Sequence, residues 1–211
     1  MIYELRIYTL LPGRTGDWLK LAGEHAVRVR GDNYGKLEGY WQTEFGTLNQ
    51  IYHLWSYTDL NERARLREAL WKLPAWLNDY VAKARPLMLT QENKILLPLL
   101  QLKAPAEPGN LYELRSYRME PGRVGEWSDL FKKHLAIREK YSKIVGLWQT
   151  EMGGLNEVTH IWAYKDLNQR MAARAAVAQD AEWQGFIGQG RPFLRHMTST
   201  LLVPAPFSPL R

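Results

Sequence analysis

The chain has 211 residues, a formal net charge of +6 and no cysteine. Its length and its 45% of apolar residues allow two ordinary hydrophobic cores, so we expect a soluble globular protein. The lack of cysteine excludes disulfides, thiolate metal sites and a cysteine nucleophile.

The positive charge is compatible with an acidic small molecule, but the basic residues are scattered and mostly have acidic neighbours. We therefore expect no nucleic-acid partner. No apolar run reaches the roughly 20 residues that span a bilayer, so we also expect no membrane segment. A strand-like pattern begins at the second residue with no targeting leader before it, which predicts the cytoplasm.

The first sixty residues predict a strand, a helix and a hairpin. Side chains of residues 2–9 alternate in direction, as in a half-buried strand. After the turn Pro12-Gly13-Arg14, large and apolar residues recur at helical spacing from Trp18 to Val29, which predicts a helix to about residue 32. Residues 39–45 and 50–57 are predicted strands of an antiparallel hairpin, joined by a tight connection at 46–49.

A helical region and a last strand follow. Asp59 and Glu62 match a capping box, which predicts a helix from there to about residue 71. Its basic stretch, residues 63–67, is interpreted as a solvated face. Pro74 breaks this helix, a further helix is expected at about 75–84, and the last strand ends at Pro98.

The whole succession then returns. Tyr3-Glu4-Leu5-Arg6 matches Tyr112-Glu113-Leu114-Arg115 at an offset of 109 residues, and Trp41-Gln42-Thr43-Glu44 matches Trp148-Gln149-Thr150-Glu151 at an offset of 107. About a third of the aligned positions are identical, which indicates a tandem duplication with a two-residue deletion before Gly146. We predict a first domain at 1–98, a Pro-rich linker at 99–108, a second domain at 109–204 and a tail at 205–211.

The order β-α-β-β-α-β in each copy predicts two tandem ferredoxin-like domains of the α+β class, each an antiparallel sheet with helices on one face. Residues repeated in both copies alternate on the strands. We assign them to the sheet face away from the helices and expect this face to be covered by the same face of the other copy, as in a dimeric α/β barrel. These residues are Glu4, Arg6, Tyr8, His53, Trp55 and Tyr57, with Glu113, Arg115, Tyr117, His160, Trp162 and Tyr164 in the second copy.

The repeated motifs resemble the NIPSNAP family. These motifs are Tyr-Glu-Leu-Arg-x-Tyr, Trp-Gln-Thr-Glu-x-Gly-x-Leu-Asn and His-x-Trp-x-Tyr-x-Asp-Leu-Asn-x-Arg, each present twice. The resemblance covers residues 1–98 and 109–204. It implies a dimeric α/β barrel related to small-molecule monooxygenases and isomerases, and it implies no particular reaction, because the family has no generally established activity.

Two kinds of side chain are candidates for chemistry. His53 and His160 are the best acid-base candidates, because an ordinary pKa near ~6.5 suits proton transfer at neutral pH. Glu4 and Glu113 are candidate bases, although an internal ion pair with the neighbouring arginine explains them equally well. A histidine with a purely structural bond is also an open alternative.

The remaining repeated residues are candidate ligand contacts. Arg6 and Arg115 would clamp an acidic group, and Tyr8, Trp55, Tyr57, Tyr117, Trp162 and Tyr164 would line an aromatic pocket. Asn49 and Asn156 are interpreted as turn formers. No His pair has metal-ligand spacing, and no phosphate-binding loop or serine motif is present, so we expect no metal and no cofactor.

We therefore predict a protein that binds a small aromatic or acidic organic molecule, with cofactor-independent oxygenase or isomerase chemistry as one reading. The alternative is a non-catalytic binding or scaffolding protein whose polar sheet face only joins the two domains. Pairing of the two copies within one chain is expected, and a homo-oligomer is the alternative. The polar residues Gln91, Glu92 and Asn93 of the last strand favour the first copy as the one that carries any chemistry.

Overall fold

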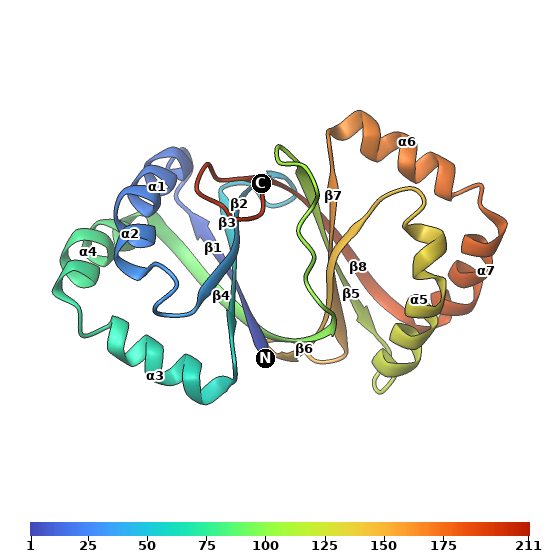
Figure 1. Cartoon of the computed structure of the whole chain (residues 1–211), viewed down its shortest axis with the longest axis horizontal. Coiled ribbons are helices and arrows are strands. Elements are labelled where there is room, and N and C mark those ends of the chain that lie inside the picture. The colour runs from blue at the N-terminus through green and yellow to red at the C-terminus, as the bar shows by residue number, and fades with distance from the viewer. The chain divides into compact units, whose positions relative to one another are not determined.

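Both repeats fold in the predicted order in the computed structural model, which describes residues 1–211 (Figure 1). The chain divides into two compact units, one of residues 1–96 with 202–211 and one of residues 97–201. The first repeat contains β1 (Ile2–Leu10), α1 (Thr15–Leu21), a π-helical turn (Ala22–Ala26), α2 (Val27–Arg30), β2 (Lys36–Phe45), β3 (Gln50–Tyr57), α3 (Leu60–Leu70), a second π-helical turn (Trp76–Val81), α4 (Ala82–Ala84), a 3₁₀ turn (Arg85–Leu87) and β4 (Met88–Leu100).

The second repeat has the same elements without the π-helical turns. It contains β5 (Leu111–Met119), α5 (Val124–Arg138), β6 (Ile144–Met152), β7 (Glu157–Tyr164), α6 (Leu167–Val177), α7 (Ala181–Gly190), a 3₁₀ turn (Arg191–Phe193) and β8 (Leu194–Pro204). None of the helices is both long and apolar enough to cross a membrane.

Each repeat forms a four-stranded sheet of the ferredoxin-like kind. The strand order is β4-β1-β3-β2 in the first repeat and β8-β5-β7-β6 in the second. The central pair is antiparallel, with Arg6 opposite His53 and Arg115 opposite His160. The mixed α/β fold with two ferredoxin-like repeats is thus confirmed. The packing of the two sheets on each other, within a chain or between chains, stays a prediction.

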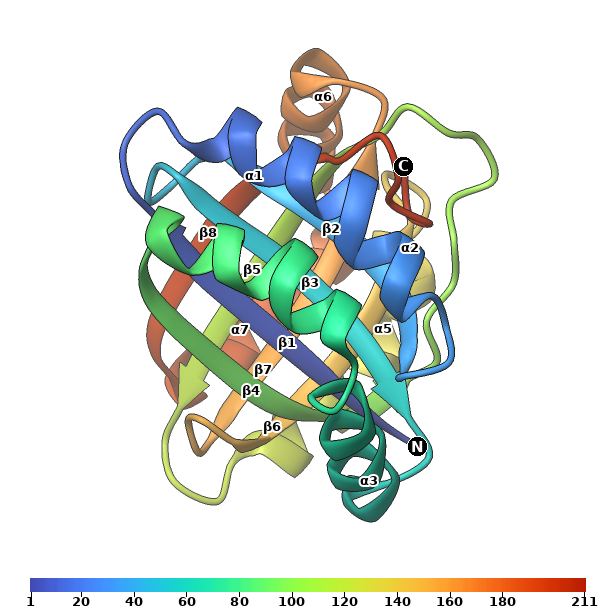
Figure 2. The same ribbon diagram turned by 90° about the vertical axis from the view of Figure 1, so that its left-hand side faces the viewer.

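The repeated polar residues lie on the sheet face that the helices cover, so their predicted assignment to the opposite face is wrong. In the first repeat α1, α2 and α4 lie across the sheet (Figure 2), and Arg63 of α3 binds Glu4. The alternative face, which includes Tyr3 and Leu54, is buried as well. Because both faces are buried, alternation in the sequence could not tell which one meets the helices.

The two π-helical turns lie where the first repeat has one residue more than the second. Trp18 and Trp127 are 109 residues apart, whereas Arg30 and Arg138 are 108 apart and hold equivalent places in their repeats. A π-helical turn takes one extra residue into a helix without displacing the next turns of that helix, and the turn at Ala22–Ala26 does so here. The loop before β2 contains the second extra residue. Together the two residues account for the predicted two-residue deletion in the second repeat.

The second π-helical turn obeys the same rule. Trp76 packs on Tyr80 with ring centroids 4.7 Å apart, and Trp183 packs on Phe186 at 4.6 Å. The spacing is four residues in the first repeat and three in the second, and the π-helical turn Trp76–Val81 absorbs the difference. Aromatic contacts are therefore kept in place although the chain lengths differ.

The repeated turn residues have local structural roles. Asn49 and Asn156 have φ angles of 58° and 57°, which asparagine tolerates better than most residues, so their interpretation as turn formers is confirmed. Their side chains also accept hydrogen bonds from the backbone N–H groups of Gly13 and Gly122. Asp59 caps α3 through the Glu62 N–H at 2.8 Å, as predicted.

The repeated Gly-x-Trp of β2 and β6 has a steric cause. A Cβ atom on Gly39 would lie 2.0 Å from the ring of Trp41, and one on Gly146 would lie 2.2 Å from that of Trp148. Each tryptophan therefore lies flat over its glycine. Both tryptophans are fully buried, and Trp41 pairs with Tyr52, on the sheet face away from the helices.

Candidate functional site

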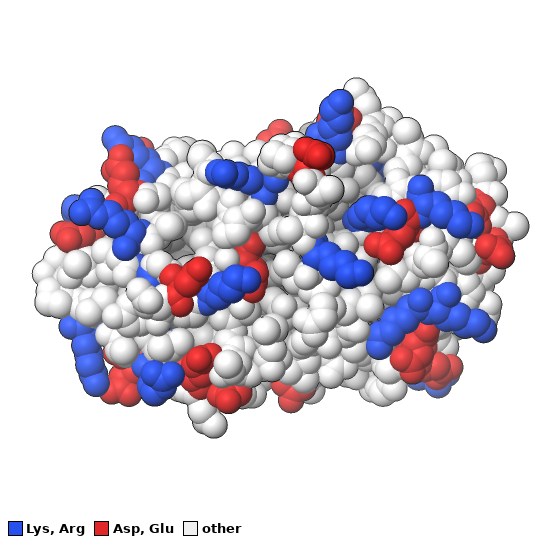
Figure 3. Space-filling model, viewed as in Figure 1, with Lys and Arg blue, Asp and Glu red and all other residues white.

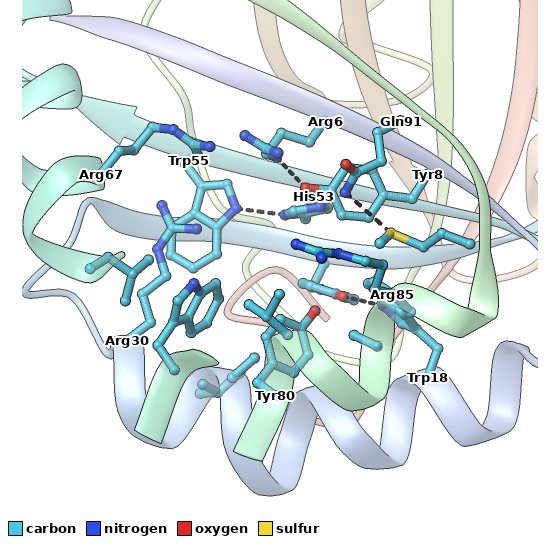
Figure 4. A pocket seen from close by; sticks show the side chains of 18 of the residues that line it. Arg6, Tyr8, Trp18, Arg30, His53, Trp55, Arg67, Tyr80, Arg85 and Gln91 are labelled. Atoms are coloured by element: carbon cyan, nitrogen blue, oxygen red, sulfur yellow. Dashed lines mark hydrogen bonds between the residues drawn. The ribbon is translucent and has the colours of Figure 1, made fainter. Parts of the chain in front are cut away.

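Each repeat contains one cavity between its helices and its sheet. The cavity of the first repeat has a volume of about 160 Å³ (Figure 4), and that of the second about 420 Å³. Nine lining positions carry the same residue type in both. They are Arg6, Tyr8, Trp18, Arg30, His53, Trp55, Arg67, Trp76 and Arg85 in the first repeat, and Arg115, Tyr117, Trp127, Arg138, His160, Trp162, Arg174, Trp183 and Arg191 in the second.

The glutamates lie behind these cavities, in networks of arginines. Glu4 accepts hydrogen bonds from Arg6 at 2.8 Å and Arg63 at 2.6 Å, and its side chain is completely inaccessible to solvent. Glu113 accepts bonds from Arg115 at 2.6 Å and from two nitrogens of Arg170 at 3.0 and 2.8 Å. A buried carboxylate with this many cationic donors is fully paired.

The arginines hold both glutamates in the charged form. Burial alone would raise the pKa of Glu4, but the hydrogen bond from Arg63 and the charges of Arg6 and Arg63 outweigh it and lower the pKa to about 2. The pKa of Glu113 is lowered to about 2 in the same way, with Arg170 and Ser199 as hydrogen-bond donors. A group with this pKa is a weak base at neutral pH, so the geometry favours the ion-pair reading of the glutamates over the candidate base.

The histidines each have one bonded and one free ring nitrogen. The indole N–H of Trp55 donates to Nδ1 of His53 at 2.6 Å, and Trp162 donates to Nδ1 of His160 at the same distance. Because Nδ1 is the acceptor, the proton of the neutral imidazole is placed on Nε2. Nε2 is buried without a partner in both residues. Each histidine therefore lines its cavity with a ring whose Nε2–H is buried and has no hydrogen-bond partner.

The environment keeps both histidines neutral. Burial lowers the pKa of His53 well below its ordinary value, and the positive charges of Arg6 and Arg30 lower it further. Burial and the charge of Arg115 lower the pKa of His160 to about 3. The acid-base role of these histidines stays a prediction, and the geometry and the lowered pKa favour a neutral hydrogen-bond donor.

Arg30 and Arg138 complete the charged part of the wall. The guanidinium of Arg30 lies 3.3 Å from the ring centre of Trp55, and that of Arg138 lies 4.4 Å from that of Trp162. Arg30 also donates to the Tyr57 hydroxyl at 2.6 Å, while its pKa, lowered to about 10 by burial, leaves it charged at neutral pH. Cation–π stacking fixes the orientation of both guanidinium groups.

The cavities are therefore aromatic and positively charged. Figure 4 shows arginine side chains that reach the first cavity from the sheet (Arg6) and from the helical region (Arg30, Arg67 and Arg85). No carboxylate lines either cavity. On the face of the molecule that Figure 3 shows, by contrast, positive and negative side chains are interspersed.

The two cavities differ in the size and polarity of some lining or neighbouring residues. Trp71 lines the first cavity where Ala178 lines the second. Tyr40 of β2 stacks on His53, with ring centroids 5.0 Å apart, and the equivalent residue of β6 is Leu147. The loss of the large Trp71 side chain is consistent with the wider second cavity.

The structure brings most of the predicted site residues together. Tyr57 and Tyr164 are the exceptions among the aromatic ones, since they bind Arg30 and Arg138 and do not line the cavities. The interpretation of residues 63–67 as a solvated face is wrong for Arg63 and Arg67, which point to Glu4 and into the cavity. Their recurrence as Arg170 and Arg174 was the available sequence signal.

Arg30 and Arg138 were missed for a different reason. Their offset of 108 residues lies between the two offsets of the repeat, so a comparison at either fixed offset does not align them. The structure brings no group of three or more His, Asp or Glu side chains together that could hold a metal ion.

Comparison with known proteins agrees with this architecture. The family model NIPSNAP matches residues 3–101 and again residues 112–209. The chain belongs to the NIPSNAP family. Protein NipSnap homolog 3A from Homo sapiens is 32% identical to this NIPSNAP chain over 217 residues, which cover 100% of the chain and 86% of the human protein.

This NIPSNAP chain also resembles solved structures of other proteins, but only in fold. A monooxygenase-like protein from Lactobacillus acidophilus has a TM-score of 0.69 and 14% identity, covering 96% of this chain and 92% of its own. An anthrone oxidase-like protein has a TM-score of 0.65 and 11% identity, covering 95% and 90%. At these identities the comparison shows a shared α/β architecture.

Proposed function

We propose that this NIPSNAP protein binds a small aromatic anion in the cavity of its second repeat. The observation that carries the proposal is the unpaired Nε2–H of His160 in a wall that also contains four arginines. A hydrogen-bond donor and several guanidinium groups stabilise a carboxylate or phenolate oxygen, and aromatic walls bind the rest of the ligand.

Size favours the second cavity over the first. Its volume of about 420 Å³ lies in the range of small-molecule sites, whereas the first, at about 160 Å³, has room for a single small ring. Ala178 and Gln184 line the second cavity, whereas the bulky Trp71 lines the first. The proposal is therefore specific for one repeat.

Binding is supported more strongly than proton transfer. His160 is neutral and Glu113 is charged at neutral pH, so neither moves a proton easily there. An oxygenase or isomerase reaction would fit this wall if the substrate enters as an anion, since fixed donors then stabilise the negative charge. A non-catalytic binding protein is the second candidate, and the low pKa of His160 favours it.

Isothermal titration calorimetry with 2-naphthoate, and with the neutral 2-naphthamide as matched control, tests the proposal. We expect 2-naphthoate to bind with a stoichiometry of one and the amide to bind at least about tenfold more weakly. His160→Gln should weaken 2-naphthoate binding by about tenfold, which corresponds to roughly 1.4 kcal/mol.

The matched variant in the first repeat is His53→Gln, and we expect it to leave binding within about twofold of the parent protein. Equal binding of the acid and the amide would remove the anionic part of the proposal. Equal losses from the two histidine variants would remove its assignment to the second repeat, and absence of any binding would remove it altogether.

A further inference from the structure

The first repeat contains an internal arrangement that the second lacks. The indole N–H of Trp18 donates to the hydroxyl oxygen of Tyr40 at 2.6 Å, in the buried interior of the repeat. The Tyr40 ring also stacks on His53 at an interplanar angle of 27°. Burial raises the pKa of Tyr40, so its hydroxyl stays protonated. In this repeat a phenol from the protein itself satisfies the tryptophan donor.

The corresponding donor of the second repeat has no such partner. Trp127 is equivalent to Trp18, and Leu147 is equivalent to Tyr40. Phe131 packs on Trp127 with ring centroids 5.0 Å apart, but neither Leu147 nor Phe131 can accept a hydrogen bond. Trp127 lines the cavity, and no hydrogen bond of its indole N–H is present in the structure.

Gly190 leaves this donor accessible. It occupies the position of Ala84 in the first repeat. A Cβ atom on Gly190 would lie 3.2 Å from Nε1 of Trp127, which is a tight approach. Gly190 has the ordinary right-handed helical conformation, with φ of −82°, so the backbone does not require glycine there. Its role is to keep space next to the indole N–H.

Trp127 and His160 thus both line the cavity of the second repeat. No hydrogen bond is made by the indole N–H of Trp127, and the Nε2–H of His160 is buried without a partner. The two rings lie 6.4 Å apart between centroids, so one small ligand can reach both. Buried donors in native proteins normally have acceptors, because an unpaired one loses its bond to water without replacement. A ligand in this cavity can supply such an acceptor in place of water.

We infer that the ligand of the second cavity is a hydroxylated aromatic acid, whose hydroxyl or phenolate oxygen accepts the indole N–H of Trp127 as the Tyr40 oxygen accepts that of Trp18. This inference rests on the proposed function and adds the second polar group of the ligand. The acid group is assigned to the arginines of the wall. In the first repeat, the Tyr40 hydroxyl then occupies the place of the ligand's oxygen, so no ligand is needed to pair with the Trp18 donor.

The test compares 6-hydroxy-2-naphthoate with 2-naphthoate by calorimetry on the full chain at pH 7.5. We expect the hydroxylated acid to bind the parent protein at least about fivefold more tightly. Gly190→Ala places a methyl group against the indole N–H and should bring the ratio of the two dissociation constants close to one. Trp127→Phe, which removes the donor, should do the same.

Ala84→Gly is the matched control in the first repeat, and it should keep the preference for the hydroxylated acid. Equal affinity of the parent protein for the two acids would overturn the inference while the proposed function stands. A preference that survives both Gly190→Ala and Trp127→Phe would overturn it as well. If neither acid binds, the proposed function fails and the inference with it.

Discussion

The two repeats share their strands' polar residues and differ in the residues that surround them. Glutamate, arginine, tyrosine, histidine and tryptophan occupy equivalent positions on β1 and β3 and on β5 and β7. In both repeats the glutamate lies opposite the tryptophan and the arginine lies opposite the histidine. The positions that changed are Tyr40 to Leu147, Ala22 to Phe131, Trp71 to Ala178 and Ala84 to Gly190. After duplication, the charge network was kept and the cavity around it was reshaped.

This difference changes the expectation of which repeat is active. In the sequence, the polar residues Gln91, Glu92 and Asn93 favour the first repeat as the one that carries any chemistry. In the structure, Asn93 and Ser199 have the same role, since each donates a hydrogen bond to the glutamate of its repeat. These two residues are therefore equivalent, whereas Gln91 lines the first cavity and Met197 lines the second. The larger cavity favours the second repeat.

The largest expected effect tests what the repeats have in common. Both histidines have a lowered pKa in the folded state, so the unfolded chain binds more protons below its histidine pKa near 6.5. The free energy of unfolding is thus highest above that pH. Below it, the free energy of unfolding decreases by about 1.4 kcal/mol per pH unit for each histidine that stays neutral in the folded protein. Between pH 6.5 and 4.5 we expect His160 alone to contribute a loss of roughly 2 kcal/mol in urea unfolding experiments, and His53 to add a loss of the same sign.

His53→Gln and His160→Gln should each remove part of this pH dependence. An intact slope in either variant would show that its histidine is protonated in the folded protein. Below pH 4.5 a further loss should appear, because Glu4 and Glu113 have a lowered pKa of about 2 when folded and the unfolded carboxyls take up protons first.

The second prediction looks for a difference within the charge networks. Arg6→Ala should lower the free energy of unfolding by about 3 kcal/mol or more, because it weakens the pairing of a buried carboxylate. Arg115→Ala should cost less. Arg170 gives Glu113 two hydrogen bonds, whereas Arg63 gives Glu4 one. Urea denaturation of both variants at pH 7.5 measures the difference, and equal losses would contradict it.

The sequence predicted the elements, the turns and most cavity residues, because these depend on local patterns that occur twice. It could not assign the faces of the sheet. Leu54 and Trp55 are both buried, so burial does not distinguish the two sides of β3. It also missed Arg30, whose place depends on a π-helical turn that shifts the helix by one residue. The lowered pKa of His53 depends first on its burial and then on the charges of Arg6 and of Arg30 from a helix, and strand alternation reveals neither the burial nor Arg30.

The third prediction exchanges the wall residues in which the two cavities differ. Ala178→Trp should fill the second cavity and weaken 2-naphthoate binding by about tenfold, or roughly 1.4 kcal/mol. Trp71→Ala should widen the first cavity and raise the calorimetric stoichiometry from one towards two, with little loss of stability since Trp71 is 44% exposed. If both variants bind like the parent protein, these residues do not account for the difference between the repeats.

The smallest expected effect concerns the C-terminal tail, which packs on the first repeat. Ser208 is buried and its hydroxyl accepts the N–H of Tyr40 at 2.9 Å. The ring of Phe207 lies 4.9 Å from that of Tyr40 and would be 3.0 Å from a Cβ atom on Gly23, in the π-helical turn. The tail thus contacts Tyr40 both through the Ser208 hydroxyl and through the Phe207 ring.

We expect Phe207→Ala to lower the free energy of unfolding by only about 1 kcal/mol, because this side chain is half-buried and a fully buried phenylalanine costs about 3 to 5 kcal/mol. Its effect should be local. Hydrogen exchange of the Tyr40 amide should become faster, while that of Leu147, the equivalent residue of the second repeat, stays as in the parent protein. Faster exchange at both amides would mean that the tail stabilises the whole chain and is no special feature of the first repeat.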